Sequence, residues 1–231
     1  MGFGAPGIVE LRTFRPSLSG YFAEWDSAVT LADSKRAKTA RKRLLQRAID
    51  QLPKEPSRHP GLYVYADLSA PGIAGINYIG IAQGSLRSIG WRLTDRFRDD
   101  SCLDTGLDGM PDELAAARID LRLRIAMPRT AEAKRLEYVS DHIATAHLIR
   151  RSSHILVLPC DETPADIRDL ERILIGSASE AGAPLTNRAH IRRRRNDDLR
   201  LLQRGMEALD LLRTQGLSED CHAVWSATLR S

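Results

Sequence analysis

The sequence contains no long hydrophobic run and few cysteines, and each absence argues against a class of protein. No stretch of its 231 residues approaches the roughly 20 consecutive apolar residues that a membrane-spanning helix requires. Residues 1–20 lack the basic start and apolar run of a secretion signal, so we expect a cytoplasmic protein without a membrane partner. The cysteines, Cys102, Cys160 and Cys221, are odd in number and widely separated, which indicates neither a disulfide framework nor a zinc site.

Positive charge is modest in total but concentrated in two segments. The net charge is +4. The first segment contains Lys35, Arg36, Lys38, Arg41, Lys42, Arg43 and Arg47, and the second contains Arg188, Arg192, Arg193, Arg194, Arg195, Arg200 and Arg204. Such grouping suits a polyanion, because each neutralised phosphate releases counterions. We therefore predict nucleic-acid contacts for Lys38, Arg41, Lys42 and the run from Arg192 to Arg195. The alternative is that both segments are solvated helix faces.

The spacing of apolar residues predicts helices together with a small sheet. Residues 33–51 have the period of an amphipathic helix, and the prolines that follow, up to residue 60, indicate a linker. Two runs of β-forming residues, 61–68 and 76–82, flank a turn and predict a β-hairpin. A short apolar run at residues 153–158 predicts a third strand.

The remaining segments complete an α+β fold. Helices are predicted at residues 91–98, 130–150, 164–180 and 197–215. Residues 119–127 alternate apolar residues with Arg122 and Arg124, which predicts a further strand. The expected architecture is a small three-stranded antiparallel sheet flanked by helices, with an N-terminal helical extension, a central strand-helix insertion and a C-terminal helix. The expected boundaries are a basic extension over residues 1–60, a core over 61–190 with an insertion near 100–150, and a basic helical segment over 191–231.

Two tripeptides in the predicted hairpin, GLY at residues 61–63 and YIG at residues 78–80, are followed by a particular order of polar residues. Arg92 lies on the next predicted helix, Glu171 on the helix predicted at residues 164–180, and Asn187 in the sequence PLTN. In this order the residues resemble the signature of the GIY-YIG endonuclease family. The resemblance covers residues 61–98 and 153–188.

The resemblance implies a nuclease that hydrolyses DNA phosphodiester bonds with Mg²⁺ or Mn²⁺. It implies that Tyr63 orients or deprotonates the attacking water and that Tyr78 forms a hydrogen bond within the site. It further implies that Arg92 stabilises the transition state, that Glu171 binds the metal ion and that Asn187 buttresses the site by hydrogen bonding.

The position of Glu171 is informative without the family name. It lies four residues after Ile167 and three before Leu174, on the helical stripe that should face the sheet. A carboxylate there must be paired, hydrated or bound to a metal ion. One carboxylate suffices for Mg²⁺, which retains several waters. The alternative is that Glu171 pairs with Arg168 or Arg172.

The chain departs from the family pattern at two positions. Many members have a histidine four residues after the catalytic arginine, where this chain has Arg96. A guanidinium cannot act as a general base, so we predict that Arg96 binds phosphate. Restriction-type members often have a lysine where this chain has Ile81. A competing alignment would use Glu137 as the metal ligand, but no PxxN sequence follows Glu137.

The function that the resemblance favours is a site-specific, restriction-type endonuclease acting on double-stranded DNA. The nearest alternative is a repair or mobile-element nuclease that recognises DNA structure, and another is a nucleic-acid-binding protein that no longer cuts. One active site per chain requires a homodimer or sequential nicking for a double-strand break.

Overall fold

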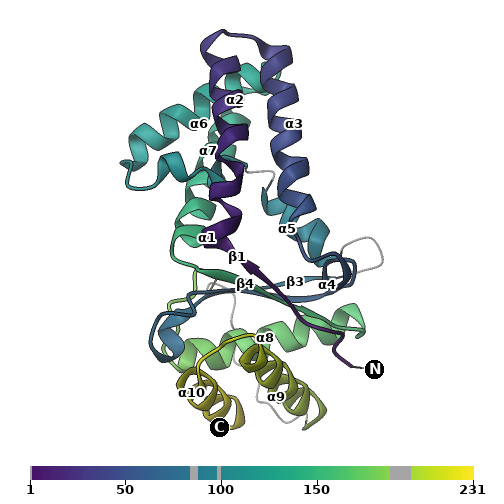
Figure 1. The fold of residues 1–231 in the computed structure, drawn as a ribbon. Coiled ribbons are helices and arrows are strands. Elements are labelled where there is room, and N and C mark those ends of the chain that lie inside the picture. The colour runs from purple at the N-terminus through teal and green to yellow at the C-terminus, as the bar shows by residue number, and fades with distance from the viewer. Residues whose placement is uncertain (1, 84–87, 98–99, 188–198) are drawn as a thin grey trace. The chain divides into compact units, whose positions relative to one another are not determined.

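The computed structural model describes residues 2–83, 88–97, 100–187 and 199–231 (Figure 1). The fold is α+β, mostly helical, with a small antiparallel sheet of four strands. The chain divides into two compact units. The first unit contains Met1–Glu10, Pro53–Arg92 and Arg151–Ser231, and the second contains Leu11–Leu52 and Leu93–Arg150. Among the described helices, none combines the length and the apolar composition needed to cross a membrane.

The sheet belongs to the first unit and has the strand order β1-β4-β2-β3. Its strands are β1 (Gly7–Glu10), β2 (Gly61–Ala66), β3 (Ile76–Ala82) and β4 (His154–Pro159). The predicted hairpin and the predicted third strand are confirmed, because β2 pairs antiparallel with both β3 and β4. The expected count of three strands is wrong. β1 adds a fourth strand on β4, with Gly7 opposite Val157.

Alternation along the strands gives the sheet two different faces. Leu62, Val64 and Ala66 point into a hydrophobic core that also contains Leu174 and Trp225. Figure 1 shows the helices that supply this core together on one side of the sheet. They are α8 (Pro164–Glu180), α9 (Leu199–Thr214) and α10 (Glu219–Arg230). The expectation of a single C-terminal helix is therefore incomplete. The side chain of Ser218 accepts a hydrogen bond from the Cys221 amide and starts a second helix there.

The second unit is helical. It contains α1 (Leu11–Phe14), α2 (Ser19–Thr30), α3 (Ser34–Asp50), α6 (Asp112–Ala126) and α7 (Glu132–Arg150), and most of α5 (Ile89–Phe97). The predicted helix at residues 33–51 is confirmed, and the Asp33 side chain caps it by accepting from the Arg36 amide. One-turn elements are α4 (Lys54–Ser57) in the first unit and the 3₁₀ turns Pro16–Leu18, Gly72–Gly75, Asp100–Leu103 and Thr105–Leu107.

The predicted strand at residues 119–127 is wrong, because these residues lie almost entirely in α6. Ala115, Ile119, Leu123 and Ala126 are buried at the spacing of one helix face. The alternation of apolar residues with Arg122 and Arg124 indicates a solvated side, but Arg122 is buried. The central insertion is consequently helix-helix, formed by α6 and α7, and contains no described strand.

Arg122 is 1% exposed and is held by carboxylates from two other segments of the second unit. Its guanidinium donates to Asp26, with Nε 2.6 Å from Oδ1, and to Asp104, with Nη2 2.7 Å from Oδ2. The rings of Phe22 and Trp25 lie 5.2 Å from its Cζ. Burial raises the pKa of Asp26, but the hydrogen bonds and charges of its arginine partners outweigh burial and lower that pKa overall. Arg122 thus joins α2, α6 and the turn before Thr105.

We expect Arg122→Met to lower the free energy of unfolding by about 3–5 kcal/mol, because Asp26 and Asp104 lose their buried cation. Urea unfolding measures the change. Arg124→Met is the matched control, since Arg124 is exposed and pairs with Asp120, and we expect it to cost about 1 kcal/mol or less. Equal losses for the two variants would show that Arg122 does not organise this unit.

Candidate active site

Tyr63 and Tyr78 lie in contact on the face of the sheet opposite α8. Tyr63 is fully buried, and its ring stacks on that of Tyr78 with centroids 6.0 Å apart. Tyr65 lies on the same face and meets both rings edge-on at 6.2 and 6.0 Å. The Tyr63 hydroxyl is buried and has no hydrogen-bond partner among the described residues. A buried hydroxyl in that state is costly, so the site favours a water or substrate oxygen beside it.

Gly80 provides the space that Tyr63 occupies. The two residues are direct partners in the β2–β3 register. A Cβ at Gly80 would lie 2.6 Å from Cζ and 2.7 Å from Oη of Tyr63, and 2.6 Å from Cε1 of Tyr78. Any side chain at this position would displace the two tyrosines. The last residue of the YIG tripeptide therefore has a steric reason to be glycine.

Gly61 has a comparable role at the start of β2. A Cβ at this position would lie 2.2 Å from the Leu158 carbonyl oxygen and 2.9 Å from the Cys160 amide nitrogen. The close approach lets β2 begin its pairing with β4 at Gly61, opposite Pro159. The register fixed here places Tyr63 on the tyrosine face two residues later.

Glu171 occupies the sheet-facing side of α8, as its spacing predicts. Its neighbours Leu170 and Leu174 are buried in the core, while Glu171 itself is half-buried. Thr163 caps the helix by accepting from the Asp166 amide. Glu171 pairs with neither of the arginines that sequence suggested as alternatives. Its carboxylate has no hydrogen bond or ion pair among the described residues.

Those two arginines have other partners. Arg172 pairs with Asp169, with Nη1 3.0 Å from Oδ1, and Arg168 reaches Oε1 of Gln83 at 3.5 Å. Burial raises the pKa of Glu171 from its ordinary value of 4.5 to about 7, against the opposing charges of Arg172, Arg92 and Arg168. Arg92 therefore lies close enough to influence Glu171 electrostatically without forming an ion pair with it. A half-buried carboxylate with a strongly raised pKa beside guanidiniums is a candidate functional group.

Arg92 is half-buried at the end of the first turn of α5. The helix start is anchored to the first unit by the Ile89 amide, which donates to the His59 carbonyl at 2.9 Å. The predicted helix is thus confirmed, beginning two residues earlier than expected. Arg96 lies in the same helix, but its side chain falls outside the described part of the chain.

Asn187 lies against the outer edge of β3. Its Nδ2 donates to the Ile79 carbonyl at 2.5 Å, and the preceding Thr186 amide donates to the Asn77 carbonyl at 3.0 Å. The Oδ1 atom of Asn187 is buried and has no partner among the described residues. The contact fixes Asn187 against the strand that contains Tyr78.

The outer edge of β3 is contacted by Asn187, whereas Tyr63 lies on the neighbouring strand β2. β3 is the outer strand on its side of the sheet. Gln83, the partner of Arg168, directly follows β3, and Arg168 precedes Glu171 on α8 by three residues. The structure thus brings Tyr63 together with Tyr78 and Glu171 together with Arg92. No contact among the described residues joins the two pairs.

The predicted nucleic-acid-binding residues have different surroundings. Lys38 and Lys42 are exposed on α3, whereas Arg41 pairs with the buried carboxylate of Asp100, with Nε 2.8 Å from Oδ2. Arg192, Arg193, Arg194 and Arg195 lie outside the described residues. Arg200 and Arg204, from the same basic segment, pair with the nearly buried Glu162 and so help to hold α9 in place.

Sequence reasoning missed the contributions of Tyr65, Arg168 and Gly80. The position of Tyr65 can be predicted from the sequence, because a residue two positions after Tyr63 in a strand lies on the same face. From the sequence alone, Arg168 is considered only as an ion-pair partner of Glu171. The steric role of Gly80 depends on the strand register, which spacing alone leaves open.

We expect Gly80→Ala to lower the free energy of unfolding by about 1–3 kcal/mol, because the added methyl group overlaps the rings of Tyr63 and Tyr78. Near-ultraviolet circular dichroism should report the changed tyrosine environment and urea unfolding the stability. Gly20→Ala in α2 is the control, since a Cβ there meets nothing within 4 Å. An unaltered tyrosine signal in Gly80→Ala would contradict the proposed packing.

We expect Glu171→Gln to stabilise the protein at about pH 8 by about 1–2 kcal/mol and to have little effect at about pH 5. Between the ordinary pKa of 4.5 and the raised pKa of about 7, the folded protein binds a proton that the unfolded chain has released. The free energy of unfolding therefore falls as the pH rises through this range. Glutamine cannot ionise, so the Glu171→Gln protein does not lose this stability. Urea unfolding at both pH values measures the difference, with exposed Glu180→Gln on the same helix as control. An equal gain in the free energy of unfolding at both pH values would refute the raised pKa of Glu171.

Comparisons with protein-family models, with curated proteins and with solved structures find no match to this chain. The assignment of a function therefore depends on the chemistry and geometry of the chain's own residues.

Proposed function

We propose that this protein is a metal-dependent endonuclease that hydrolyses DNA phosphodiester bonds with an active site of the GIY-YIG type at the outer edge of β3. The main support is the state of Glu171. It is a half-buried carboxylate without an ion pair among the described residues, its pKa is raised to about 7, and Arg92 from another helix lies within electrostatic range. A side chain that only stabilised the fold would be paired or replaced by an apolar one.

The donor set near Glu171 fits a magnesium or manganese ion that retains most of its water. Among the described residues, no three histidine, cysteine, aspartate or glutamate side chains gather as a metal cage. A hard divalent cation does not need one, because a single carboxylate, waters and a substrate phosphate complete its coordination. Glu171 would hold the ion. When bound, it supplies Lewis-acid stabilisation of the phosphate and lowers the pKa of a bound water.

The other residues supply what phosphodiester hydrolysis needs besides the metal ion. Arg92 holds positive charge near Glu171, where negative charge builds on the phosphate oxygens. Tyr63 offers a buried hydroxyl to orient the attacking water or to receive its proton. Tyr78 stacks on Tyr63, and Asn187 fixes the strand beneath it. Double-stranded DNA is the substrate, and a homodimer or sequential nicking produces a double-strand break.

Incubation of supercoiled plasmid with the purified protein and Mg²⁺ tests the proposal. We expect nicked and linear products with the unsubstituted protein, none in EDTA, and a rate lower by on the order of 100-fold or more for Glu171→Gln. The matched control is Glu180→Gln, an exposed glutamate on the same helix, which should cut normally. Mg²⁺ should also raise the unfolding temperature of the unsubstituted protein but not that of Glu171→Gln.

The outcomes separate the proposal from its alternatives. Full activity of Glu171→Gln would remove Glu171 from the reaction. DNA binding without cleavage under any metal condition would identify a binding protein that no longer cuts. Discrete fragments from linear duplex DNA would indicate a restriction-type enzyme, and cleavage confined to flaps or branched junctions would indicate a repair or mobile-element nuclease.

A further inference from the structure

Positive charge is concentrated on one helix of the second unit. α3 contains seven basic residues and one acidic residue, Asp50, and so has a net charge of +6. The whole chain has a net charge of +4, which leaves −2 for all the other residues together. α3 is therefore one of the two segments in which the positive charge of the chain is concentrated, the other being residues 188–204.

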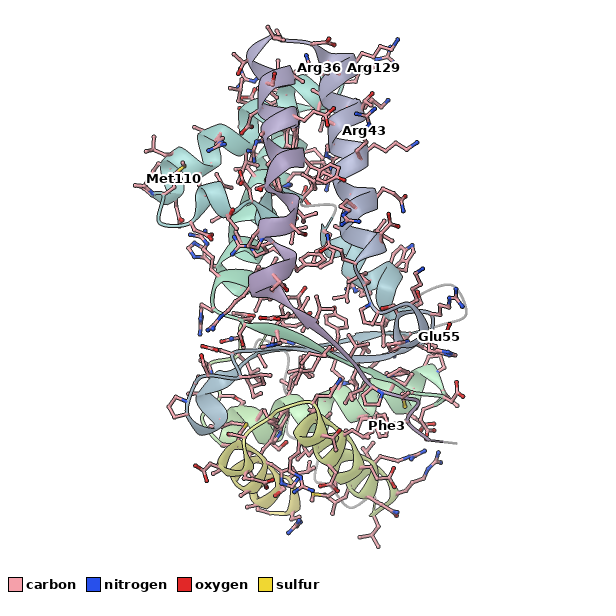
Figure 2. All side chains as sticks on the ribbon, in the orientation of Figure 1. Phe3, Arg36, Arg43, Glu55, Met110 and Arg129 are labelled. Carbon is pink, nitrogen blue, oxygen red and sulfur yellow. The ribbon has the colours of Figure 1, made fainter. Side chains whose placement is uncertain are left out.

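Most of this charge is not neutralised by neighbouring side chains. The basic residues of α3 that are exposed and have no ion pair among the described residues are Lys35, Arg36, Lys38, Lys42 and Arg47. They are here called the free basic face. Two other cations of α3 have partners, since Arg41 pairs with Asp100 and Arg43 with Glu24. In Figure 2 the labels of Arg36 and Arg43 mark this helix, and side chains extend outward along its free side.

On the neighbouring helices α6 and α7 of the same unit, exposed cations form ion pairs with acidic side chains. On α6, Arg124 pairs with Asp120 at 2.7 Å, and on α7, Lys134 pairs with Glu137 at 2.8 Å. Arg135 also pairs with Asp120. α6 and α7 therefore intersperse both signs of charge. α3 differs from both of them.

The arrangement on α3 also opposes the stability of the helix. Lys35 and Arg36 lie in its first turn, which contains no acidic residue, although the positive end of the helix dipole disfavours cations there. Lys38 and Lys42 are four residues apart and therefore repel each other. A pattern that costs stability at several positions is explained by a polyanion that binds it.

We propose that the free basic face of α3 is the surface by which the second unit docks onto the sugar-phosphate backbone of duplex DNA. The inference rests on the proposed function and names a contact surface for the same substrate outside the catalytic unit. From Lys35 to Arg47 the helix rises about 18 Å, equal to the axial length of about five base pairs. Flexible lysine and arginine side chains along such a length contact successive phosphates without reading base sequence.

Arg41 differs from the rest of the basic segment. Its carboxylate partner Asp100 is fully buried, so this ion pair belongs to the interior of the second unit. The contact fixes the side of α3 that faces inward. Lys38 and Lys42, three residues before Arg41 and one after it, are both exposed.

The test compares two triple variants that each lose three positive charges. Lys35→Gln, Lys38→Gln and Lys42→Gln together neutralise part of the free basic face. Arg124→Gln, Lys134→Gln and Arg213→Gln remove the same charge from exposed cations that already have acidic partners. Fluorescence anisotropy with a labelled DNA duplex in EDTA measures binding without cleavage, over a series of salt concentrations.

We expect the α3 variant to bind duplex DNA on the order of 100-fold more weakly near 0.1 M salt. The slope of log affinity against log salt should flatten by about 2.7, or about 0.9 for each lost phosphate contact. The loss should be the same for duplexes of unrelated sequence. The control variant should bind and cleave like the unsubstituted protein. Thermal unfolding should show the α3 variant to be at least as stable as the unsubstituted protein, because glutamine removes repulsion without disfavouring the helix.

Three results would overturn the inference: unchanged binding by the α3 variant, equal losses in both variants, or tighter binding of single-stranded RNA than of duplex DNA through the same residues. Because binding is measured without a divalent cation, it is independent of catalysis. Failure of plasmid cleavage would contradict the proposed nuclease function while leaving the docking result intact.

Discussion

The register of β2 against β3 is the constraint on which the rest of the candidate active site depends. Tyr63 lies opposite Gly80, the residue that leaves room for its ring. A shift of one residue would move Tyr63 into the hydrophobic core and Leu62 onto the tyrosine face. Pairing with β4 on the other side of β2, starting at Gly61, fixes the same register a second time. Two glycines thus allow the close backbone and ring contacts from which the position of the tyrosines follows.

The proposed nuclease function places an electrostatic constraint on Glu171. A phosphodiester is negatively charged, and an ionised Glu171 would repel it in the absence of cations. Arg92, Arg168 and Arg172 partly offset the carboxylate charge, although burial still raises its pKa to about 7. The ionisation state of Glu171 is therefore balanced near neutral pH. A divalent cation would favour the ionised form, so that metal binding and proton release are coupled at this residue.

How much the sequence predicts depends on whether the relevant contacts are local. Strands β2, β3 and β4 and helices α3, α7 and α8 follow from patterns within each segment, and their predicted limits agree closely with the structure. β1 has four residues and pairs with a strand far along the chain, so no local pattern indicates it. The strand predicted at residues 119–127 was wrong because the burial of Arg122 depends on Asp26 and Asp104, and periodicity within the segment cannot reveal these partners.

The same limit applies within the candidate active site. Spacing along α8 correctly placed Glu171 on the sheet-facing stripe, because that relation is internal to one helix. It could not show that Arg168 and Arg172 bond Gln83 and Asp169 instead, since each arginine can reach several partners on the helix surface. Ion-pair choice among exposed side chains involves differences of about 1 kcal/mol or less, well below what residue spacing can rank. The absence of a pair at Glu171 among the described residues is consequently a finding of the structure, and it supports the proposal that this carboxylate binds a metal ion.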